Sequence, residues 1–169
     1  MVAFYDLADE GIIMREMNPL YVEALIHGTN KCPYFTLLSM KLLQFDIGRS
    51  LLQIDVQDKH LQPFGMVHGG VFSSIIDAAA FWAVYPEVDE NAGLTSVDLK
   101  LNYLAPSSRG KLIATGRRIK LGKTLGLGEA EVTDENGRIL AHGTSTLIIL
   151  PDFPFGHEGT LPPKFIERP

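Results

Sequence analysis

The feature that most constrains this chain is an uninterrupted apolar run from Gly69 to Tyr85, GGVFSSIIDAAAFWAVY. Its length and its three consecutive alanines favour a helix over a strand, and Pro86 ends it. Because such a helix is apolar on nearly all sides, it has to be buried. The simplest packing is an antiparallel sheet that curves around one long helix, so the sequence predicts an α+β fold with its central helix at about 69–85.

The segments on either side of this helix have the pattern of strands. Leu52, Ile54 and Val56 alternate with polar residues, as in a half-buried strand. The Asn136-Gly137 pair is typical of a tight hairpin turn. The strands expected on these grounds lie at 37–47, 49–57, 94–104, 111–121, 124–134 and 138–150. Two strands, one buried helix and four strands correspond to the hotdog fold, in which the sheet wraps the helix.

The length of 169 residues fits one domain with short extensions. We expect an N-terminal helical segment over 1–34, with a short helix or arm over 1–17 and then a helix that begins at Asn18-Pro19 and ends at Gly28. The packed domain should cover 35–150. Five of the ten prolines lie in 151–169, which favours a Pro-rich tail, loose or held by contacts, over a second domain.

Composition narrows the partners and the compartment. The net charge of −5 argues against a nucleic acid or an anionic membrane as the main partner. The single cysteine, Cys32, excludes an intrachain disulfide, and the acidic residues near the start do not resemble a secretion signal. The histidines outside the central motif lack metal-ligand spacing. We therefore expect a cytoplasmic protein with no metal, no nucleic acid and no membrane partner.

Asp77 is the only charged residue in the central apolar run. A carboxylate within a buried helix costs several kcal/mol unless it is paired or functional. Two interpretations remain open. In one, Asp77 faces a polar seam and accepts a hydrogen bond from Ser73, one turn back. In the other, it is held in a partly desolvated cleft, where it acts as a base or nucleophile.

The same helix opens with His68-Gly69-Gly70. Glycines lack a Cβ, so their backbone N–H groups can approach a ligand closely. Unpaired N–H groups at a helix N-terminus, together with the helix dipole, favour a developing negative charge, as in an oxyanion hole for acyl transfer. The alternative is a tight turn from loop to helix with no chemical role.

Gly69 and Asp77 are eight residues apart, about 12 Å along a helix. One helix therefore cannot direct both groups at the same carbonyl carbon. Two antiparallel copies related by a two-fold axis can, with Gly69 of one subunit opposite Asp77 of the other. If the two groups share a site, the sequence predicts a homodimer with two active sites at its interface.

Four segments resemble one known family. They are GMVHGGVFSSIIDAAA (65–80), LTSVDLKLNYLAP (94–106), RRIKLGKTLG (117–126) and AHGTST (141–146). Over roughly 35–150 the chain is similar to PaaI-type hotdog thioesterases, a group that includes 4-hydroxybenzoyl-CoA thioesterases. The resemblance implies hydrolysis of an acyl-CoA or aryl-CoA thioester without any cofactor, since CoA is part of the substrate. We also expect self-association as a homodimer, while the sequence leaves open whether dimers pair further into a homotetramer.

The resemblance also assigns roles to residues of the central motif. In that family an acidic residue at the place of Asp77 is the nucleophile or general base, and the N–H of Gly69 supplies the oxyanion hole. Gln62 would orient the thioester or water, although many members have Asn there. Ser96 would assist in the partner subunit, and His68 would position the loop by hydrogen bonding.

A second set of residues is implied to contact CoA. It comprises Gly70, Tyr103, Arg117, Lys120, Lys123 and Thr124. Independently of the resemblance, Arg117, Arg118, Lys120 and Lys123 place four positive charges in seven residues of an acidic protein. Such a cluster attracts the phosphates of a nucleotide, but it is also typical of a solvated strand edge.

Two other functions are compatible with the same fold, because fold alone does not decide function. One is a non-catalytic protein that binds acyl-CoA, and the other is a hydratase or dehydratase of enoyl-CoA. Neither the acyl group nor the choice between nucleophile and general base for Asp77 follows from the sequence.

Overall fold

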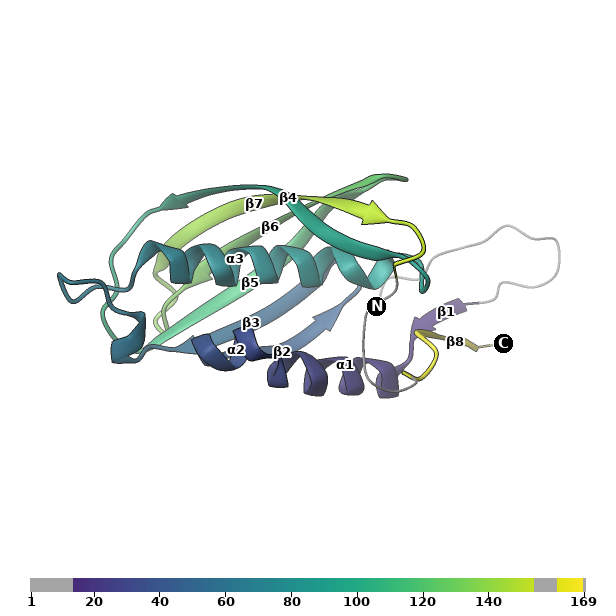
Figure 1. The fold of residues 1–169 in the computed structure, drawn as a ribbon, viewed down its shortest axis with the longest axis horizontal. Coiled ribbons are helices and arrows are strands. Elements are labelled where there is room, and N and C mark those ends of the chain that lie inside the picture. The colour runs from purple at the N-terminus through teal and green to yellow at the C-terminus, as the bar shows by residue number, and fades with distance from the viewer. Residues whose placement is uncertain (1–13, 154–160, 169) are drawn as a thin grey trace.

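A six-stranded antiparallel sheet wraps one long helix, α3 (Gly69–Val84), as Figure 1 shows. The structure, a computed structural model, describes residues 14–153 and 161–168. The strands follow the spatial order β2-β3-β5-β6-β7-β4, so β2 and β4 are the sheet edges. Their bounds are β2 Met40–Asp46, β3 Arg49–Asp55, β4 Gly93–Tyr103, β5 Lys111–Leu121, β6 Leu125–Thr133 and β7 Ile139–Leu150. The predicted hotdog fold is confirmed.

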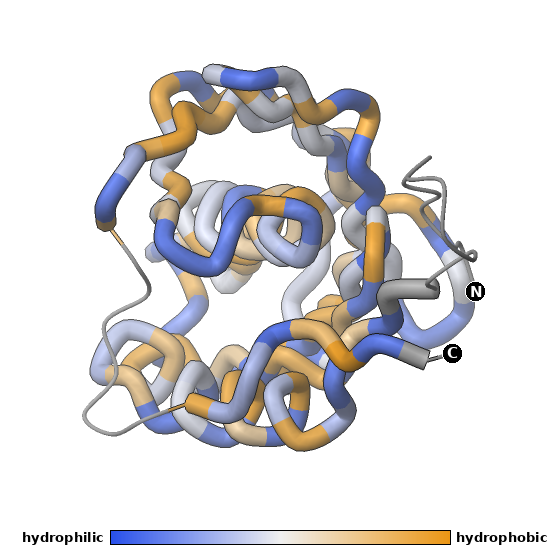
Figure 2. The backbone as a smooth tube through the Cα atoms, turned by 90° about the vertical axis from the view of Figure 1, so that its right-hand side faces the viewer, coloured by the Kyte–Doolittle hydropathy of each residue, from blue (hydrophilic) through white to orange (hydrophobic). Residues whose placement is uncertain are grey.

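Two helices that precede the sheet lie on the side of α3 that the sheet leaves open. They are α1 (Pro19–Lys31) and α2 (Pro33–Leu38). Figure 2 looks along α3 and shows the sheet curving over it, with the N-terminal helices beneath. The central helix is thus enclosed by the sheet on one side and by α1 and α2 on the other.

The backbone of α3 rests directly on the sheet. A Cβ atom on Gly116 would lie 2.2 Å from the carbonyl oxygen of Ala79, and one on Gly128 would lie 2.7 Å from that of Ala80. Real Cβ atoms do not approach so closely, so these two strand positions admit only glycine at this spacing. The run of alanines in the helix therefore meets glycines in the sheet, and the two backbones pack in close contact.

The opposite face of α3 differs from the expected burial on all sides. Ser74, Asp77, Ala78 and Phe81 recur at helical spacing, and all four are only partly buried. This stripe lines a cavity under α1 and α2. Among residues 14–153 and 161–168, no helix is long and apolar enough to cross a membrane.

Two predicted boundaries at the N-terminal side are wrong. The first helix does not end at Gly28 but continues to Lys31, because its buried face extends to Thr29 and tertiary packing outweighs one internal glycine. The strand expected from residue 37 begins only at Met40, because Pro33 starts the short helix α2. Ser39, with a φ of 49°, ends α2 in the left-handed conformation.

The two ends of the described chain pair with each other. β1 (Met14–Met17) and β8 (Phe165–Arg168) form a separate two-stranded antiparallel sheet. The last part of the expected arm at 1–17 is therefore a strand, whereas its residues 1–13 lie outside the described residues. Of the predicted tail, residues 161–168 are ordered by contact with the domain.

Lys164 fastens this tail to the C-terminal end of α3. Its side chain is only 1% exposed, and its Nζ donates hydrogen bonds to the carbonyl oxygens of Tyr85 and Val88. The ammonium also lies 4.4 Å from the centre of the Tyr85 ring. Burial is the largest influence on this group and lowers the pKa of Lys164 from 10.5 to about 8, against the opposing charge of Glu90 and its neighbours.

This lowered pKa predicts how stability depends on pH. Between about pH 8 and pH 10.5 the unfolded chain keeps a proton that folded Lys164 has released, so the free energy of unfolding rises with pH. From pH 8 to pH 10 we expect wild type to gain about 2 kcal/mol relative to Lys164→Met, measured by urea unfolding. Equal pH slopes for the two proteins would contradict a neutralised, buried lysine. The measurement stops at pH 10 because burial also raises the pKa of Tyr21. Above pH 10 the unfolded chain loses the Tyr21 proton that the folded chain keeps, so the free energy of unfolding falls with pH.

Candidate functional site

The loop before α3 is held by a buried histidine. The Nδ1 of His60 accepts a hydrogen bond from the N–H of Gln57 at 3.0 Å, and its Nε2 lies 2.9 Å from the carbonyl oxygen of Leu38. Burial lowers the pKa of His60, which favours a neutral ring with Nδ1 as acceptor and Nε2 as donor. The carbonyl of His60 in turn accepts from the N–H of His68 at 2.8 Å, so this ring fixes the start of the central helix.

His68 caps α3 and thereby decides which backbone donors stay free. Its Nδ1 accepts from the N–H of Gly70 at 2.8 Å, and its carbonyl accepts from the N–H of Val71 at 2.9 Å. Within the described ranges, the N–H of Gly69 makes no hydrogen bond. Gly69, not Gly70, is therefore the free donor at this helix N-terminus.

Tyr103, near the end of β4, lies over Gly69. A Cβ on Gly69 would be 2.8 Å from the hydroxyl of Tyr103, so the exposed Tyr103 side chain would have to move to admit one. Ser73 donates to the carbonyl of Gly69 at 3.1 Å and lies 3.4 Å from the Tyr103 hydroxyl. The hydrogen bond considered between Ser73 and Asp77 is thus absent from the hydrogen bonds of the described residues, because Ser73 is turned toward the start of the helix.

Two serines of the sheet hold Asp77 instead. Ser96 of β4 donates to its Oδ1 at 2.6 Å, and Ser145 of β7 approaches the same oxygen at 3.1 Å. Among the described residues, Oδ2 has no hydrogen-bond partner, which leaves one carboxylate oxygen available. Ser96 contacts Asp77 of its own chain, and the role expected of it in a partner subunit stays a prediction.

Ser145 was not anticipated from the sequence. It is fully buried and faces the helix together with Gly143 and Leu147, the neighbouring inward positions of β7. A polar residue at an inward position of a central strand is the signal that would have found it, since a buried hydroxyl needs a partner.

Asp77 borders a cavity of about 540 Å³ between α3 and the two N-terminal helices. Its volume falls within the range of small-molecule sites. On the α3 side the cavity is lined by Ser73, Ser74, Asp77, Ala78, Phe81 and Trp82. On the other sides it is lined by Gly28, Thr29, Cys32, Tyr34, Phe35, Met40 and Leu99. Asp77 is therefore next to an open, mostly apolar cavity.

Gln62 belongs to the loop that precedes the helix. Its side-chain oxygen accepts from the N–H of Phe64 at 2.7 Å, which leaves the amide NH₂ as its available donor. Within the part of the chain that the structure describes, no hydrogen bond joins Gln62 to Gly69 or Asp77. The structure thus brings together Gly69 with Tyr103 and Asp77 with Ser96, but not these two pairs with each other.

The residues expected around the nucleotide fall into separate places. Lys120, Lys123 and Thr124 are exposed at the turn between β5 and β6. This turn lies near the C-terminal end of α3, because a Cβ on Gly126 would be 2.7 Å from Val84. Since 16 helical residues span about 24 Å, the turn is remote from Gly69 of the same chain.

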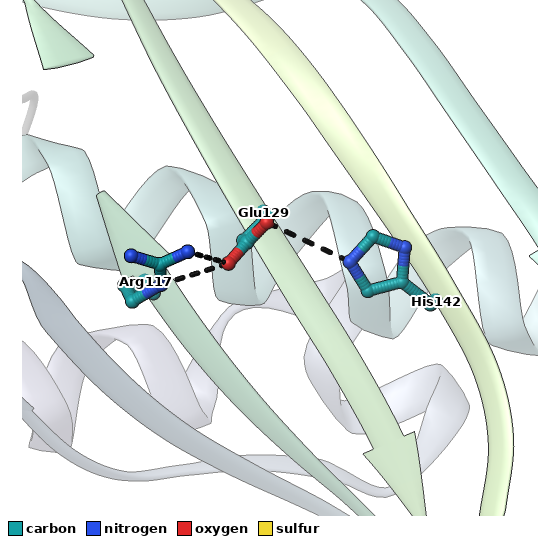
Figure 3. Close-up of polar contacts among 3 residues, drawn as sticks. All are labelled: Arg117, Glu129 and His142. Carbon is teal, nitrogen blue, oxygen red and sulfur yellow. Dashed lines mark hydrogen bonds and ion pairs between the residues drawn. The ribbon is translucent and has the colours of Figure 1, made fainter. Parts of the chain in front are cut away.

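The two arginines of the basic cluster form ion pairs with two different glutamates, Arg117 with Glu129 and Arg118 with Glu87. Figure 3 shows Arg117 and His142 on either side of Glu129, across the outer face of β5, β6 and β7. Arg117 donates from Nε to Glu129 at 2.7 Å, and the Nε2 of His142 is 3.7 Å from the same carboxylate. Among the described residues, Lys120 and Lys123 are therefore the members of the cluster without an ion pair.

Comparison with known proteins gives a consistent result. The profile of the Thioesterase superfamily matches residues 64–141. The 1,4-dihydroxy-2-naphthoyl-CoA hydrolase of Listeria monocytogenes is 26% identical over 112 residues, which are 66% of this chain and 91% of that protein. Human acyl-coenzyme A thioesterase 13 is 27% identical, over 59% of this chain and 71% of the relative.

Solved structures agree with the architecture. A thioesterase from Haemophilus influenzae superposes with a TM-score of 0.71 at 21% identity, over 80% of this chain and 94% of the other. A thioesterase family protein from Silicibacter pomeroyi superposes with a TM-score of 0.71 at 25% identity, over 78% of this chain and 98% of the other. The profile match includes the capped helix N-terminus and Asp77. Residues 64–141 therefore match the thioesterase superfamily, and the chain has the hotdog fold.

Proposed function

We propose that this chain hydrolyses acyl-CoA or aryl-CoA thioesters to a free acid and CoA. The observation that carries the proposal is Asp77, a carboxylate within a buried helix that is oriented by Ser96 and Ser145 and keeps one oxygen free beside a cavity. The match of residues 64–141 to the Thioesterase superfamily supports it, as do the names of the relatives. A carboxylate held in this way is equipped to accept a proton or to attack a carbonyl.

Two routes use the same groups. As a general base, Asp77 takes a proton from water while the water oxygen bonds to the thioester carbon. As a nucleophile, a carboxylate oxygen bonds to that carbon and water later hydrolyses the mixed anhydride. In both routes the carbonyl oxygen gains negative charge, the carbon–sulfur bond breaks, and the CoA sulfur leaves as a thiolate that is then protonated.

The developing charge needs a donor, and the free N–H of Gly69 is suited to that role. It lies at the N-terminus of α3, where the helix dipole favours negative charge. His68 contributes indirectly, since its ring occupies the N–H of Gly70 and fixes the cap. The free NH₂ of Gln62 is suited to orient the thioester or the water.

A homodimer would complete each site. Gly69 and Asp77 are about 12 Å apart on one helix, so a single thioester carbon cannot contact both in one chain. β4 carries Ser96 and Tyr103 and forms an edge of the sheet, with its outer side available for pairing. Antiparallel pairing of two β4 edges would set Gly69 of one subunit opposite Asp77 of the other.

The same arrangement accounts for the position of the lysines. Lys120 and Lys123 lie near the C-terminal end of their own α3, and in an antiparallel dimer this end approaches the N-terminus of the partner's helix. We propose that they bind CoA phosphates there, beside the partner's Gly69 and Tyr103. Gly70 and Thr124 would flank the nucleotide, whereas Arg117, already paired with Glu129, would contribute least.

Replacement of the carboxylate tests the proposal directly. Asp77→Asn preserves the side-chain shape but removes the base and the nucleophile, so we expect kcat to fall by about 10²–10⁴-fold on a panel of acyl-CoA and aryl-CoA thioesters. Thiol release is the measurement. Asp55→Asn, the same change at an exposed position of β3, is the matched control and should keep wild-type turnover.

Sedimentation should show the same oligomeric state for both variants, so that loss of activity reports chemistry and not folding. Hydrolysis by Asp77→Asn at a rate near that of wild type would overturn the assignment of Asp77.

Mixed dimers test whether one site uses two subunits. Gly69→Val places methyl groups against the Tyr103 hydroxyl and should inactivate the oxyanion end, while Asp77→Asn inactivates the other end. If each site combines Gly69 and Asp77 from different subunits, co-expression of the two inactive variants restores one intact site in every mixed dimer. With random pairing, about one quarter of wild-type activity returns.

Sites confined to one chain predict a different result. Every site in the mixed dimer would then carry one of the two substitutions, and co-expression would restore nothing above the activity of the separate variants. Tagging each variant differently confirms that mixed dimers are present in the assay.

A further inference from the structure

His60 is a buried titratable group that takes no part in the proposed chemistry. Only 1% of it is exposed. It lies at the base of the loop over 57–68, which precedes α3 and ends at the cap of that helix, His68. Across this loop Leu61 and Val67 form an antiparallel bridge, so the loop is a compact turn. A group that holds the base of the turn therefore also sets the position of the groups at the N-terminus of α3.

The two ring nitrogens of His60 have different and fixed roles. Its Nε2 lies 2.9 Å from the carbonyl oxygen of Leu38, and a carbonyl can only accept, so Nε2 carries a proton. Its Nδ1 lies 3.0 Å from the backbone nitrogen of Gln57, and an N–H can only donate, so Nδ1 carries none. One neutral tautomer satisfies both contacts, and no other state of the ring does.

A proton on Nδ1 would set two donors against each other and place a charge where the protein excludes water. The N–H of Gln57 would lose its acceptor, and the backbone around His60 would have to open. The carbonyl of His60 accepts from the N–H of His68 at 2.8 Å, so the cap of α3 would shift with it. That cap holds the N–H of Gly70 and leaves the N–H of Gly69 free. Protonation of a ring outside the site would therefore displace the donor inside it.

The surroundings of the ring favour its neutral state. On the segments bonded to it, the titratable groups are Tyr34 of α2, Asp58 and Lys59 of its own turn, and His68 at the start of α3. Burial is the largest influence and lowers the pKa of His60 below its ordinary value. The positive charge of Lys59 lowers this pKa further, against the opposing effect of the bond to Leu38. Acid conditions are therefore needed to protonate the ring.

We propose that His60 is a positioning residue for the oxyanion end of the site, and that protonation of its ring switches this end off. The inference rests on the proposed function for the reaction itself. His60 touches neither the thioester nor the water in this scheme. It acts through the loop, on the free N–H of Gly69 and on the side chain of Gln62. Asp77 of the same chain is held by serines of the sheet and stays in place.

Two substitutions separate the two ring nitrogens. His60→Asn places an amide oxygen where Nδ1 accepts from Gln57, and this oxygen does not titrate. His60→Gln reaches Leu38 but has no acceptor at the place of Nδ1. At pH 7.5 we expect His60→Asn to keep kcat within about threefold of wild type and His60→Gln to lose about tenfold. KM should change less than about twofold in both, because the displaced donor acts mainly in the transition state.

The pH profile is the readout that a merely structural role would not move. Between pH 7.5 and pH 4.5 we expect the kcat of wild type to fall about tenfold more than that of His60→Asn, since only wild type gains a proton on Nδ1. Asp77 and His68 are present in both proteins, so their titration cancels in the ratio. His27→Asn, the same change at an exposed histidine of α1, is the matched control and should keep the wild-type profile. Sedimentation at each pH confirms that folded dimers are compared.

Mixed dimers assign the effect of His60 to one end of the site. Co-expression of His60→Gln with Asp77→Asn should return about one quarter of wild-type activity, because the damaged oxyanion end and the damaged carboxylate fall in one site and leave the other intact. Co-expression with Gly69→Val should stay below about a tenth, since both subunits then lack a working oxyanion end. Activity below about a tenth in both mixtures would mean that His60→Gln harms the whole subunit, which overturns the positioning role.

Nuclear magnetic resonance tests the coupling without turnover. In ¹⁵N-labelled wild type, the amide signals of Gly69 and Gly70 should shift as the ring of His60 titrates, and this shift should be absent from His60→Asn. Amide signals that do not respond overturn the inference even if thioesters are hydrolysed, as does a wild-type pH profile equal to that of His60→Asn. A response of the amides in a protein that hydrolyses no thioester supports the coupling and overturns only the proposed function.

Discussion

The close contact between the α3 backbone and the sheet determines where every group of the candidate site lies. Ala79 and Ala80 meet Gly116 and Gly128 at distances that leave no room for a Cβ, so α3 can neither rotate nor shift along the sheet without a clash. This fixed rotation turns Asp77 toward the serines of β4 and β7 and toward the cavity on the open side. A carboxylate in an apolar helix is tolerated here because its partners are built into the sheet that the helix cannot leave.

The same rigid helix also acts as a spacer. It places a free N–H at one end and a carboxylate two turns in, and the lysine-bearing turn between β5 and β6 lies near the far end. No bending of one helix brings these groups together. A dimer is therefore a chemical requirement of the proposed reaction and not only a mode of assembly. The exposed β4 edge, which carries Ser96 and Tyr103, is the surface on which that requirement can be met.

Patterns with a strong local cause were predictable from the sequence. The length and alanine content of the 69–85 run gave the central helix, and Asn136-Gly137 marked a hairpin. What could not be predicted depends on contacts between distant segments. Gly28 ends no helix because the buried face of α1 continues beyond it, and Ser145 becomes a partner of Asp77 only when β7 lies under α3. Lys164, 79 residues after Tyr85, caps α3 for the same reason.

The helices α1 and α2, which precede the sheet, border the cavity and are tied to the rest of the chain at both ends. At the start of α1, the side-chain amide of Asn18 donates to the carbonyl oxygen of Pro163 at 2.8 Å. The backbone N–H of Asn18 donates to the carbonyl oxygen of Lys164 at 2.9 Å. Tyr21 bonds to Tyr85 at 3.0 Å, while Tyr34 of α2 bonds to Ser74. Because the tail secures α1 and α1 borders the cavity, the space beside Asp77 is shaped by residues remote from it in sequence. In the proposed function, the helix α3 supplies Gly69 and Asp77, and α1 and α2 supply part of the cavity wall beside Asp77.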